Sequence, residues 1–409
     1  MILSENLIIR KVDKFAHILN PYTGSVVTLH LDEFKQLNKT NEKDIDQEIL
    51  ETIKIPPNSM MNSRLFRSSL INLGFEYFFP TIVNIEITRR CLLDCKHCYI
   101  TPEEHMNKEI KGVESLSKRE VFQLIKKLRD LGVFLVVLTG GEPCISKNIK
   151  YFIQACHKYN MTFEIFSSLQ IIPEWFNNTL KNLARIQVSV YSTKDNIHDF
   201  ITQKPGSLKH SLENISKLKN IGFYIEIATP LMNINFDDRK NITKYFKKLE
   251  IKHNFSWPIL NEYYSTKTNK SLLNISKEDF ALFAEETPDY IIDCKWDNKD
   301  KSLCEAGISV FSISAEGKVF PCSQYPLEVG NIFENDIKEI YNGNNMKEAI
   351  SYKPADLCED CEYYNFCIGN NYSETGDPLK QPTFMAESLK YAKENLKRKE
   401  VKIYENKSC

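Results

Sequence analysis

Cysteine is the residue type in this chain with the greatest capacity for chemistry. The chain of 409 residues holds 12 cysteines, and eight of them form two blocks. The amino terminus lacks a signal-peptide pattern, and no apolar run approaches the roughly 20 residues of a membrane helix. We therefore expect a cytoplasmic protein with reduced thiols, so the cysteine spacing indicates metal binding rather than disulfides. The first block is Cys91, Cys95 and Cys98, and the second is Cys304, Cys322, Cys358, Cys361 and Cys367.

The overall composition is that of an ordinary globular protein. Hydrophobic residues make up 42% of the chain and charged residues 26%, which is enough to build a substantial core. The 53 basic and 54 acidic side chains leave a net charge of −1. Because there is no basic excess, we expect no nucleic-acid partner and no binding to an acidic membrane surface.

The spacing of the first block favours an iron–sulfur cluster. Cys91, Cys95 and Cys98 are separated by three and by two residues, which leaves a tetrahedral zinc site one ligand short. Three thiolates can hold a [4Fe–4S] cube and leave one iron open to another ligand. A zinc site completed by His97 or by a distant histidine is the alternative.

The elements that must position this loop alternate between strand and helix. Ser117 and Glu120 form a possible capping box before a helix whose apolar spacing stops at Gly132. Six βα steps predict an α/β fold, a partial (β/α)6 barrel with its chemistry at the carboxyl ends of the strands. The other expected helices are 147–159, 173–182, 207–220 and 238–250, and the expected strands are 81–88, 133–138, 162–167, 185–191, 223–229 and 255–260.

Two further domains flank the expected barrel. Residues 1–78 predict a hairpin, with strands at 16–19 and 26–29, followed by a polar, helix-rich segment, and so form a small α+β domain or arm. We place the barrel domain at 79–290 and a cysteine-rich domain with a final helix at 291–409.

The first block carries a family resemblance. The sequence Cys91-x3-Cys95-x2-Cys98-Tyr99 after the first strand resembles the signature loop of the radical S-adenosylmethionine (SAM) enzymes. Gly140-Gly141-Glu142-Pro143, after the second strand, is similar to the motif in that family that receives the SAM amino group. The resemblance implies a [4Fe–4S] cluster with an open iron and further SAM contacts by Tyr99, Ser167, Ser168, Ser189, Gln203 and Asn233.

The second block resembles the auxiliary-cluster domain called SPASM, or its shorter twitch form. Five thiolates cannot supply the eight ligands of two cubes, so we expect at least one auxiliary iron–sulfur cluster and favour one over two. Cys294 or Cys409 could complete a second cluster. A zinc ribbon built from the same cysteines is the alternative.

The resemblance implies one-electron cleavage of SAM to a 5′-deoxyadenosyl radical that abstracts hydrogen from a substrate. We favour a peptide maturase that forms a crosslink, a thioether or an epimerised residue, with the leader of a precursor peptide bound by residues 1–78 and electrons from a flavodoxin or ferredoxin. Cys144 could donate a hydrogen atom or simply fill an apolar slot. The alternatives are a radical SAM enzyme acting on a small molecule and a non-catalytic iron–sulfur or zinc scaffold.

Overall fold

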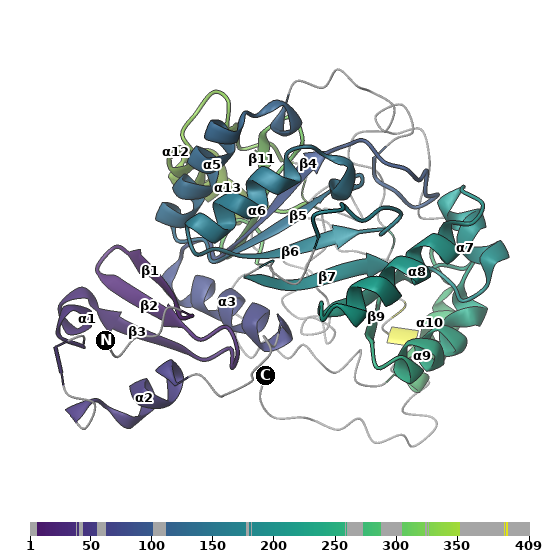
Figure 1. Ribbon diagram of the computed structural model, residues 1–409, viewed down its shortest axis with the longest axis horizontal. Helices are drawn as coiled ribbons and strands as arrows, with labels where there is room; N and C mark the ends of the chain where they lie inside the picture. The colour runs from purple at the N-terminus through teal and green to yellow at the C-terminus, as the bar shows by residue number, and fades with distance from the viewer. Residues whose placement is uncertain are drawn as a thin grey trace.

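The fold was analysed in a computed structural model of the chain (Figure 1). Among its described residues, no helix is both long and apolar enough to cross a membrane. The structure describes residues 6–37, 39–40, 44–54, 63–100, 112–176, 180, 182–257, 259, 273–287, 305–323, 325, 327–351, 388 and 390–391.

A nine-stranded sheet forms the centre of the molecule, in the order β12-β11-β10-β4-β5-β6-β7-β8-β9. Strands β4 to β9 pair in parallel with their neighbours, which is the expected partial barrel of six strands. The cysteine-rich part adds β10 in parallel beside β4, and then β11 and β12 in antiparallel pairing. The strands are β4 (Ile82–Thr88), β5 (Leu135–Gly140), β6 (Thr162–Ser167), β7 (Leu183–Ser189), β8 (Ile225–Pro230), β9 (Lys252–Ser256), β10 (Val310–Ile313), β11 (Lys318–Phe320) and β12 (Gly330–Asn331).

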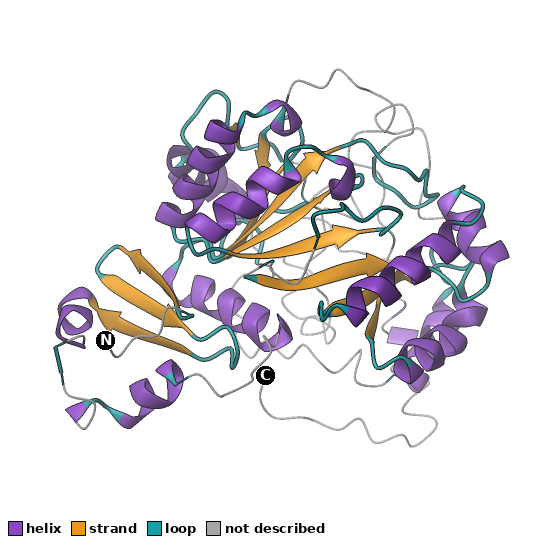
Figure 2. Ribbon diagram, viewed as in Figure 1, coloured by secondary structure: helices purple, strands orange, loops and turns teal. Residues whose placement is uncertain are grey.

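Helices cover the outer face of this sheet, as Figure 2 shows in purple beside the orange strands. Helix α5 begins at the capping box that we expected, with Ser117 and Glu120 bonded reciprocally, and it ends at Gly132 in the left-handed conformation. Alternate β5 residues such as Val136 and Leu138 pack with the apolar side of these helices. The helices are α5 (Lys118–Leu131), α6 (Ile149–Lys158), α7 (Asp195–Thr202), α8 (Ser207–Asn220), α9 (Arg239–Lys248), α10 (Lys277–Glu286), α12 (Ile337–Asn342) and α13 (Asn344–Ser351).

The structure corrects three sequence predictions. Helix 173–182 is absent from its described residues, because the chain makes a turn in which the Phe176 amide donates to the Pro173 carbonyl (2.9 Å). Helix α7 was missed, since its eight residues are fewer than the stretch over which helical periodicity can be recognised. The last strand lies at Lys252–Ser256, ahead of Pro258 rather than through it.

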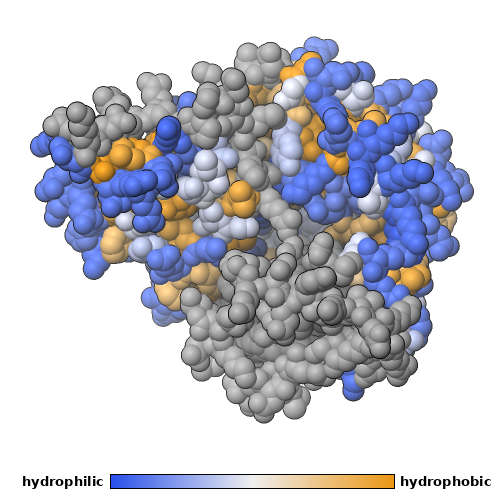
Figure 3. Space-filling model, turned by 90° about the horizontal axis from the view of Figure 1, so that it is seen from below, coloured by the Kyte–Doolittle hydropathy of each residue, from blue (hydrophilic) through white to orange (hydrophobic). Residues whose placement is uncertain are grey.

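The N-terminal unit is an antiparallel sheet followed by helices. Its sheet has the order β1-β2-β3, and β1 was not predicted from sequence. A core of its own includes Ile18 and Phe34, whereas Ile8 and Leu70 join a cluster shared with the barrel. Seen from below, the unit lies at the left with apolar orange residues among hydrophilic blue ones (Figure 3). The elements are β1 (Ile8–Val12), β2 (Phe15–Leu19), β3 (Val26–His30), α1 (Leu31–Leu37), α2 (Gln47–Ile53) and α3 (Ser63–Tyr77).

Arg10 connects the N-terminal unit to the barrel. Its guanidinium donates to the carbonyls of Val133 (2.8 Å) and Asn160 (2.9 Å) and stacks over the Phe134 ring at 5.1 Å. Burial lowers the pKa of Arg10 to about 9, which still leaves it charged at neutral pH.

We expect Arg10→Met to lower the free energy of unfolding by about 3 kcal/mol, because buried carbonyls lose charged donors. Thermal unfolding measures this loss, with Lys11→Met, an exposed neighbour on β1, as the matched control. Equal stability of the two variants would show that Arg10 does not hold the units together.

Candidate functional site

The cysteine loop lies at the carboxyl end of β4. Cys91, Cys95 and Cys98 are each partly buried, and the Cys98 amide donates to the Cys95 carbonyl (2.9 Å). The amides of Asp94 and Lys96 donate to the last turn of α7, at distances of 3.1 and 2.9 Å. The helix that sequence analysis missed therefore sets the position of the loop.

Burial governs the electrostatics of these thiols. Burial raises the pKa of Cys91 to about 11, partly offset by the Lys204 ammonium, and burial with the neighbouring thiols raises the pKa of Cys95 further. Neutral buried thiols of this kind become thiolates when a metal supplies positive charge. Three of them on one anchored loop fit a cluster that needs three protein ligands.

The zinc alternative would need three or four ligands grouped around one ion. Within the described ranges, no three His, Cys, Asp or Glu side chains meet around one point as a single metal ion requires. A cube differs, because each thiolate binds its own iron. The ring of His97 packs edge-on against Tyr191, with their centroids 4.9 Å apart.

The two glycines after β5 hold this strand end against the start of the cysteine loop. Gly140 has φ +139°, and a Cβ there would lie 2.1 Å from the Thr88 carbonyl oxygen. A Cβ at Gly141 would lie 2.3 Å from the Arg90 carbonyl oxygen, and the Glu142 amide donates to that oxygen (2.8 Å). The two glycines thus let their backbone lie close to the backbone at Thr88 and Arg90. The cysteine loop and the Gly-Gly-Glu segment therefore pack together as one unit.

Glu142 brings three of the predicted residues together. Its carboxylate is fully buried and accepts from the hydroxyls of Ser167 (2.7 Å) and Ser168 (2.6 Å). The amides of Ser168 and Cys144 also donate to it, at 2.9 and 3.1 Å. These four donors occupy the carboxylate. An ammonium can therefore bind Glu142 when a hydroxyl such as that of Ser168 rotates and releases its hydrogen bond.

Cys144 belongs to the same cluster of contacts. It is 7% exposed, packs in the main core and lies 3.8 Å from the Ser167 hydroxyl. Burial, with the Glu142 charge beside it, raises the pKa of Cys144 well above its ordinary value, so it stays a thiol.

Residues at and after the end of β7, among them the predicted SAM contact Ser189, lie beside the cysteine loop. The hydroxyl of Tyr191 lies 3.9 Å from the Cys95 sulfur and is hydrogen-bonded to Ser189. His198 accepts from the Tyr191 amide (3.2 Å), and burial lowers its pKa to about 4, so His198 is a neutral, buried support.

Two predicted SAM contacts lie apart from these groups. Gln203 is exposed at the left-handed C-cap of α7, where its amide donates to the Phe200 carbonyl. Lys204, the next residue, carries a positive charge that lowers the pKa of Cys91, against the larger raising effect of the Glu142 charge. Asn233 is exposed, whereas Asn235 is buried and donates to the carbonyls of Tyr191 and Pro230. The roles of Gln203 and Asn233 as SAM contacts stay predictions.

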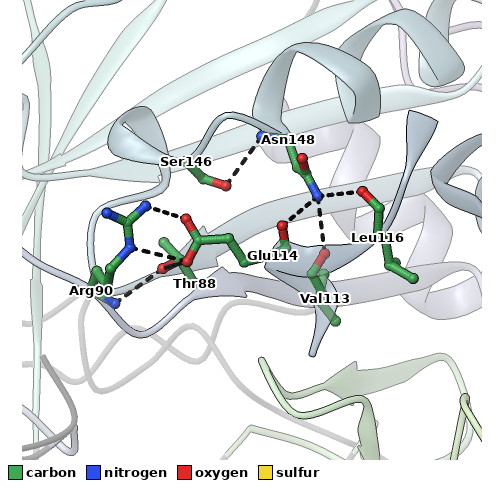
Figure 4. A network of polar contacts seen from close by, with 7 residues as sticks. All are labelled: Thr88, Arg90, Val113, Glu114, Leu116, Ser146 and Asn148. Carbon is green, nitrogen blue, oxygen red and sulfur yellow. Dashed lines mark hydrogen bonds and ion pairs between the residues drawn. The ribbon is translucent and has the colours of Figure 1, made fainter. Parts of the chain in front are cut away.

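A polar network braces the start of the cysteine loop, and Figure 4 shows Arg90 and Thr88 directed at Glu114. The Thr88 hydroxyl donates to the Glu114 carboxylate (2.6 Å), and Arg90 donates through two nitrogens. Asn148 fixes the other side by donating to the carbonyls of Val113, Glu114 and Leu116. Although burial opposes the shift, Arg90 and Thr88 hold the pKa of Glu114 below its ordinary value.

The Glu114 contacts should therefore be sensitive to acid. A carboxyl group whose pKa is lower in the folded than in the unfolded protein stabilises the fold at pH values above its unfolded pKa, which is about 4.3. This stabilisation is lost as the pH falls through the folded pKa. We expect Glu114→Gln to lower the free energy of unfolding by about 1 kcal/mol at pH 7, with the difference from wild type vanishing in acid. Chemical unfolding of the metal-free protein at several pH values measures this, and a gap that is independent of pH would contradict it.

The second cysteine block is largely beyond the described residues. Cys304, Cys358, Cys361 and Cys367 lie outside them, as do Cys294 and Cys409. Cys322 is partly buried just after β11, and its carbonyl accepts from the Tyr325 amide (3.1 Å). Its role as an auxiliary-cluster ligand stays a prediction.

Comparison with known proteins agrees with this arrangement. Residues 85–246 match the radical SAM superfamily, and residues 304–362 match an iron–sulfur cluster-binding domain, SPASM. The antilisterial bacteriocin subtilosin biosynthesis protein AlbA of Bacillus subtilis is 23% identical, across 80% of this chain and 76% of its own length. The AdoMet-dependent heme synthase of Methanosarcina barkeri is 21% identical, across 75% and 96%.

The fold also resembles a solved structure. Streptococcus suis SuiB bound to its precursor peptide SuiA has a TM-score of 0.65 at 15% identity, covering 94% of this chain and 99% of that one. A radical SAM domain implies a [4Fe–4S] cluster and SAM, and a SPASM domain implies an auxiliary iron–sulfur cluster. The chain therefore contains a radical SAM domain at residues 85–246 and a SPASM-type iron–sulfur cluster-binding domain at residues 304–362.

Proposed function

We propose that this protein is a radical SAM maturase that modifies a ribosomally made peptide. The observation that carries the proposal is the single unit formed by the cysteine loop, Gly140-Gly141 and Glu142 at the carboxyl ends of β4 and β5. The cluster and SAM, when bound, supply the one-electron chemistry that yields a carbon radical on the substrate. The likeness to SuiB with SuiA and the name of AlbA favour a peptide as that substrate.

The residues of the chain hold and orient these groups. Cys91, Cys95 and Cys98 would ligate the cluster, Glu142 would accept from the SAM ammonium, and Lys204 would face its carboxylate. Tyr99, Ser167, Ser168, Ser189, Gln203 and Asn233 stay proposed SAM contacts.

The N-terminal unit offers an edge for a leader peptide. Strand β3 pairs with β2 on one side, and among the described residues its other edge carries no strand. Val26, Val27 and Thr28 on this edge are partly exposed. An extended peptide can add to such an edge through backbone hydrogen bonds, so we assign leader recognition to residues 1–78, the radical SAM core to 79–290 and the auxiliary domain to 291–409.

The test is modification of candidate precursors. Short peptides encoded beside the gene are mixed with the reconstituted, anaerobic protein, SAM and a reductant, and mass spectrometry follows the products. A crosslink or thioether appears as loss of two hydrogens, and epimerisation as deuterium uptake from heavy water. Release of 5′-deoxyadenosine with no change in any candidate peptide would favour the small-molecule alternative, which the heme synthase relative supports.

Leader binding has its own test, which leaves the protein intact. N-methylation of alternate leader residues removes the amide donors on one side of an added strand, so one of the two alternating patterns should abolish binding. The same peptides with alanine side chains at those positions are the control. Equal binding by both N-methylated patterns would exclude strand addition.

We assign the auxiliary cluster to the second cysteine block, and electron delivery to a flavodoxin or ferredoxin in the cytoplasm. Cys358→Ala or Cys361→Ala should remove auxiliary iron but leave substrate-free SAM cleavage largely intact, because the first loop keeps its own ligands. Iron counting and 5′-deoxyadenosine release measure the two effects. Loss of all iron together with all activity would mean that this cysteine pair holds the fold of the domain.

A further inference from the structure

A carboxylate on β4, that of Glu86, is only 12% exposed and connects two parts of the chain that are distant in sequence. One oxygen of Glu86 accepts from the Tyr99 hydroxyl (2.6 Å), and the other accepts from the backbone amide of Ala315 (3.2 Å). Arg89 lies 3.9 Å from the second oxygen. Burial raises the pKa of Glu86, while the contacts from Tyr99 and Arg89 oppose this shift.

The Tyr99 side of this connection reaches the cysteine loop. Tyr99 follows Cys98 directly, and a phenol bound to a carboxylate makes a short, strong hydrogen bond. Because a buried carboxylate is costly unless its oxygens are satisfied, Glu86 fixes the phenol rather than merely touching it. The position of Tyr99 therefore depends on Glu86.

The Ala315 side belongs to the C-terminal domain. Ala315 lies in the tight turn between β10 and β11, where the Gly317 amide donates to the Ser314 carbonyl (2.9 Å). The Ala315 carbonyl accepts from the Val113 amide (2.7 Å), and a Cβ on Gly112 would lie 2.0 Å from the same oxygen. Glu316 pairs with Arg89 at 2.9 Å, so the turn is fixed on several sides beside the end of β4.

We propose that Glu86 is a positioning residue that couples the C-terminal domain to the cysteine loop through Tyr99. The turn at 314–317 supplies one of the hydrogen bonds that orient the carboxylate, and the carboxylate orients Tyr99 beside Cys98. A displacement of the turn then changes the surroundings of the SAM site without touching a cluster ligand. This inference rests on the proposed function only in placing the cluster and SAM at this loop.

Two variants test the connection, one on each side of Glu86. Ala315→Pro removes the amide donor from the first central position of a tight turn, which proline suits, and keeps the carbonyl. Tyr99→Phe removes the phenolic donor. Ser312→Ala is the control, because Ser312 joins β10 to β4 through Asn84 and touches neither Glu86 nor Tyr99. The readouts are iron content, SAM affinity, and the electron paramagnetic resonance spectrum of the reduced cluster with and without SAM.

We expect Ala315→Pro, Tyr99→Phe and Glu86→Gln each to keep wild-type iron, to weaken SAM binding about tenfold and to alter the SAM-induced spectral change. The double variant Tyr99→Phe with Ala315→Pro should be no weaker than Tyr99→Phe alone, because both act through one carboxylate. Additive losses, or a wild-type spectrum and affinity in Ala315→Pro, would overturn the proposal.

Two further outcomes remain decisive. If Ala315→Pro is insoluble, a double-mutant cycle of Glu86→Gln and Tyr99→Phe replaces it. Additive losses of SAM affinity in that cycle would show that the two side chains act independently and would overturn the proposal. If the wild-type protein binds no SAM, the proposed function is wrong and the coupling is not the cause. Because none of these assays contains a peptide, their results do not depend on which substrate is modified.

Discussion

Replacing Cys95 by alanine should reduce SAM cleavage to background and remove about four irons per chain, since two thiolates cannot hold the cube. Cys95 is the middle cysteine of the loop, and its sulfur lies 3.9 Å from the Tyr191 hydroxyl. The loop is anchored through the amides of Asp94 and Lys96, which the substitution leaves in place. Iron and sulfide counts with 5′-deoxyadenosine release measure the effect.

Cys156→Ala is the matched control for this experiment. Cys156 is fully buried on α6, has no neighbour at metal spacing and packs in the main core. Its loss should cost about 1 kcal/mol of stability and leave iron and cleavage unchanged. If Cys95→Ala still released 5′-deoxyadenosine at the wild-type rate, or if the native protein bound zinc instead of iron, the assignment of the loop would be wrong.

The second large effect is expected at Glu142. Glu142→Ala should weaken SAM binding about 100-fold with wild-type iron content, because the partner we propose for this carboxylate is the SAM ammonium and not the metal. It also leaves four buried donors without an acceptor, including both of Ser168, so the free energy of unfolding should fall by about 3 kcal/mol or more. Equilibrium binding of SAM and chemical unfolding measure the two losses.

Two companion variants separate binding from folding. Glu142→Gln keeps the size and one oxygen, so it should recover most of the stability but little of the SAM affinity. Glu213→Ala removes an exposed carboxylate on α8 and should change neither quantity. Loss of iron in step with loss of SAM affinity would show that Glu142 supports the cluster loop and does not bind the ligand.

The amino-acid sequence by itself determined the features whose causes are local. The capping box at Ser117 and Glu120, helix α8 and strand β6 follow from side-chain periodicity and from bonds within a few residues. The three-cysteine spacing and the Gly-Gly-Glu segment likewise lie within a few residues. Their positions after parallel strands place them at one edge of the sheet before any coordinate is known.

Tertiary structure decided the contacts that hold this edge in place. Glu86 bonds to Ala315 across 229 residues, and Arg10 bonds to Val133 across 123. No spacing rule predicts such pairs, because they depend on how β10 aligns with β4 and how β1 packs on the barrel. For the same reason the sequence does not show that the missing Cβ atoms of Gly140 and Gly141 let two backbone segments approach each other.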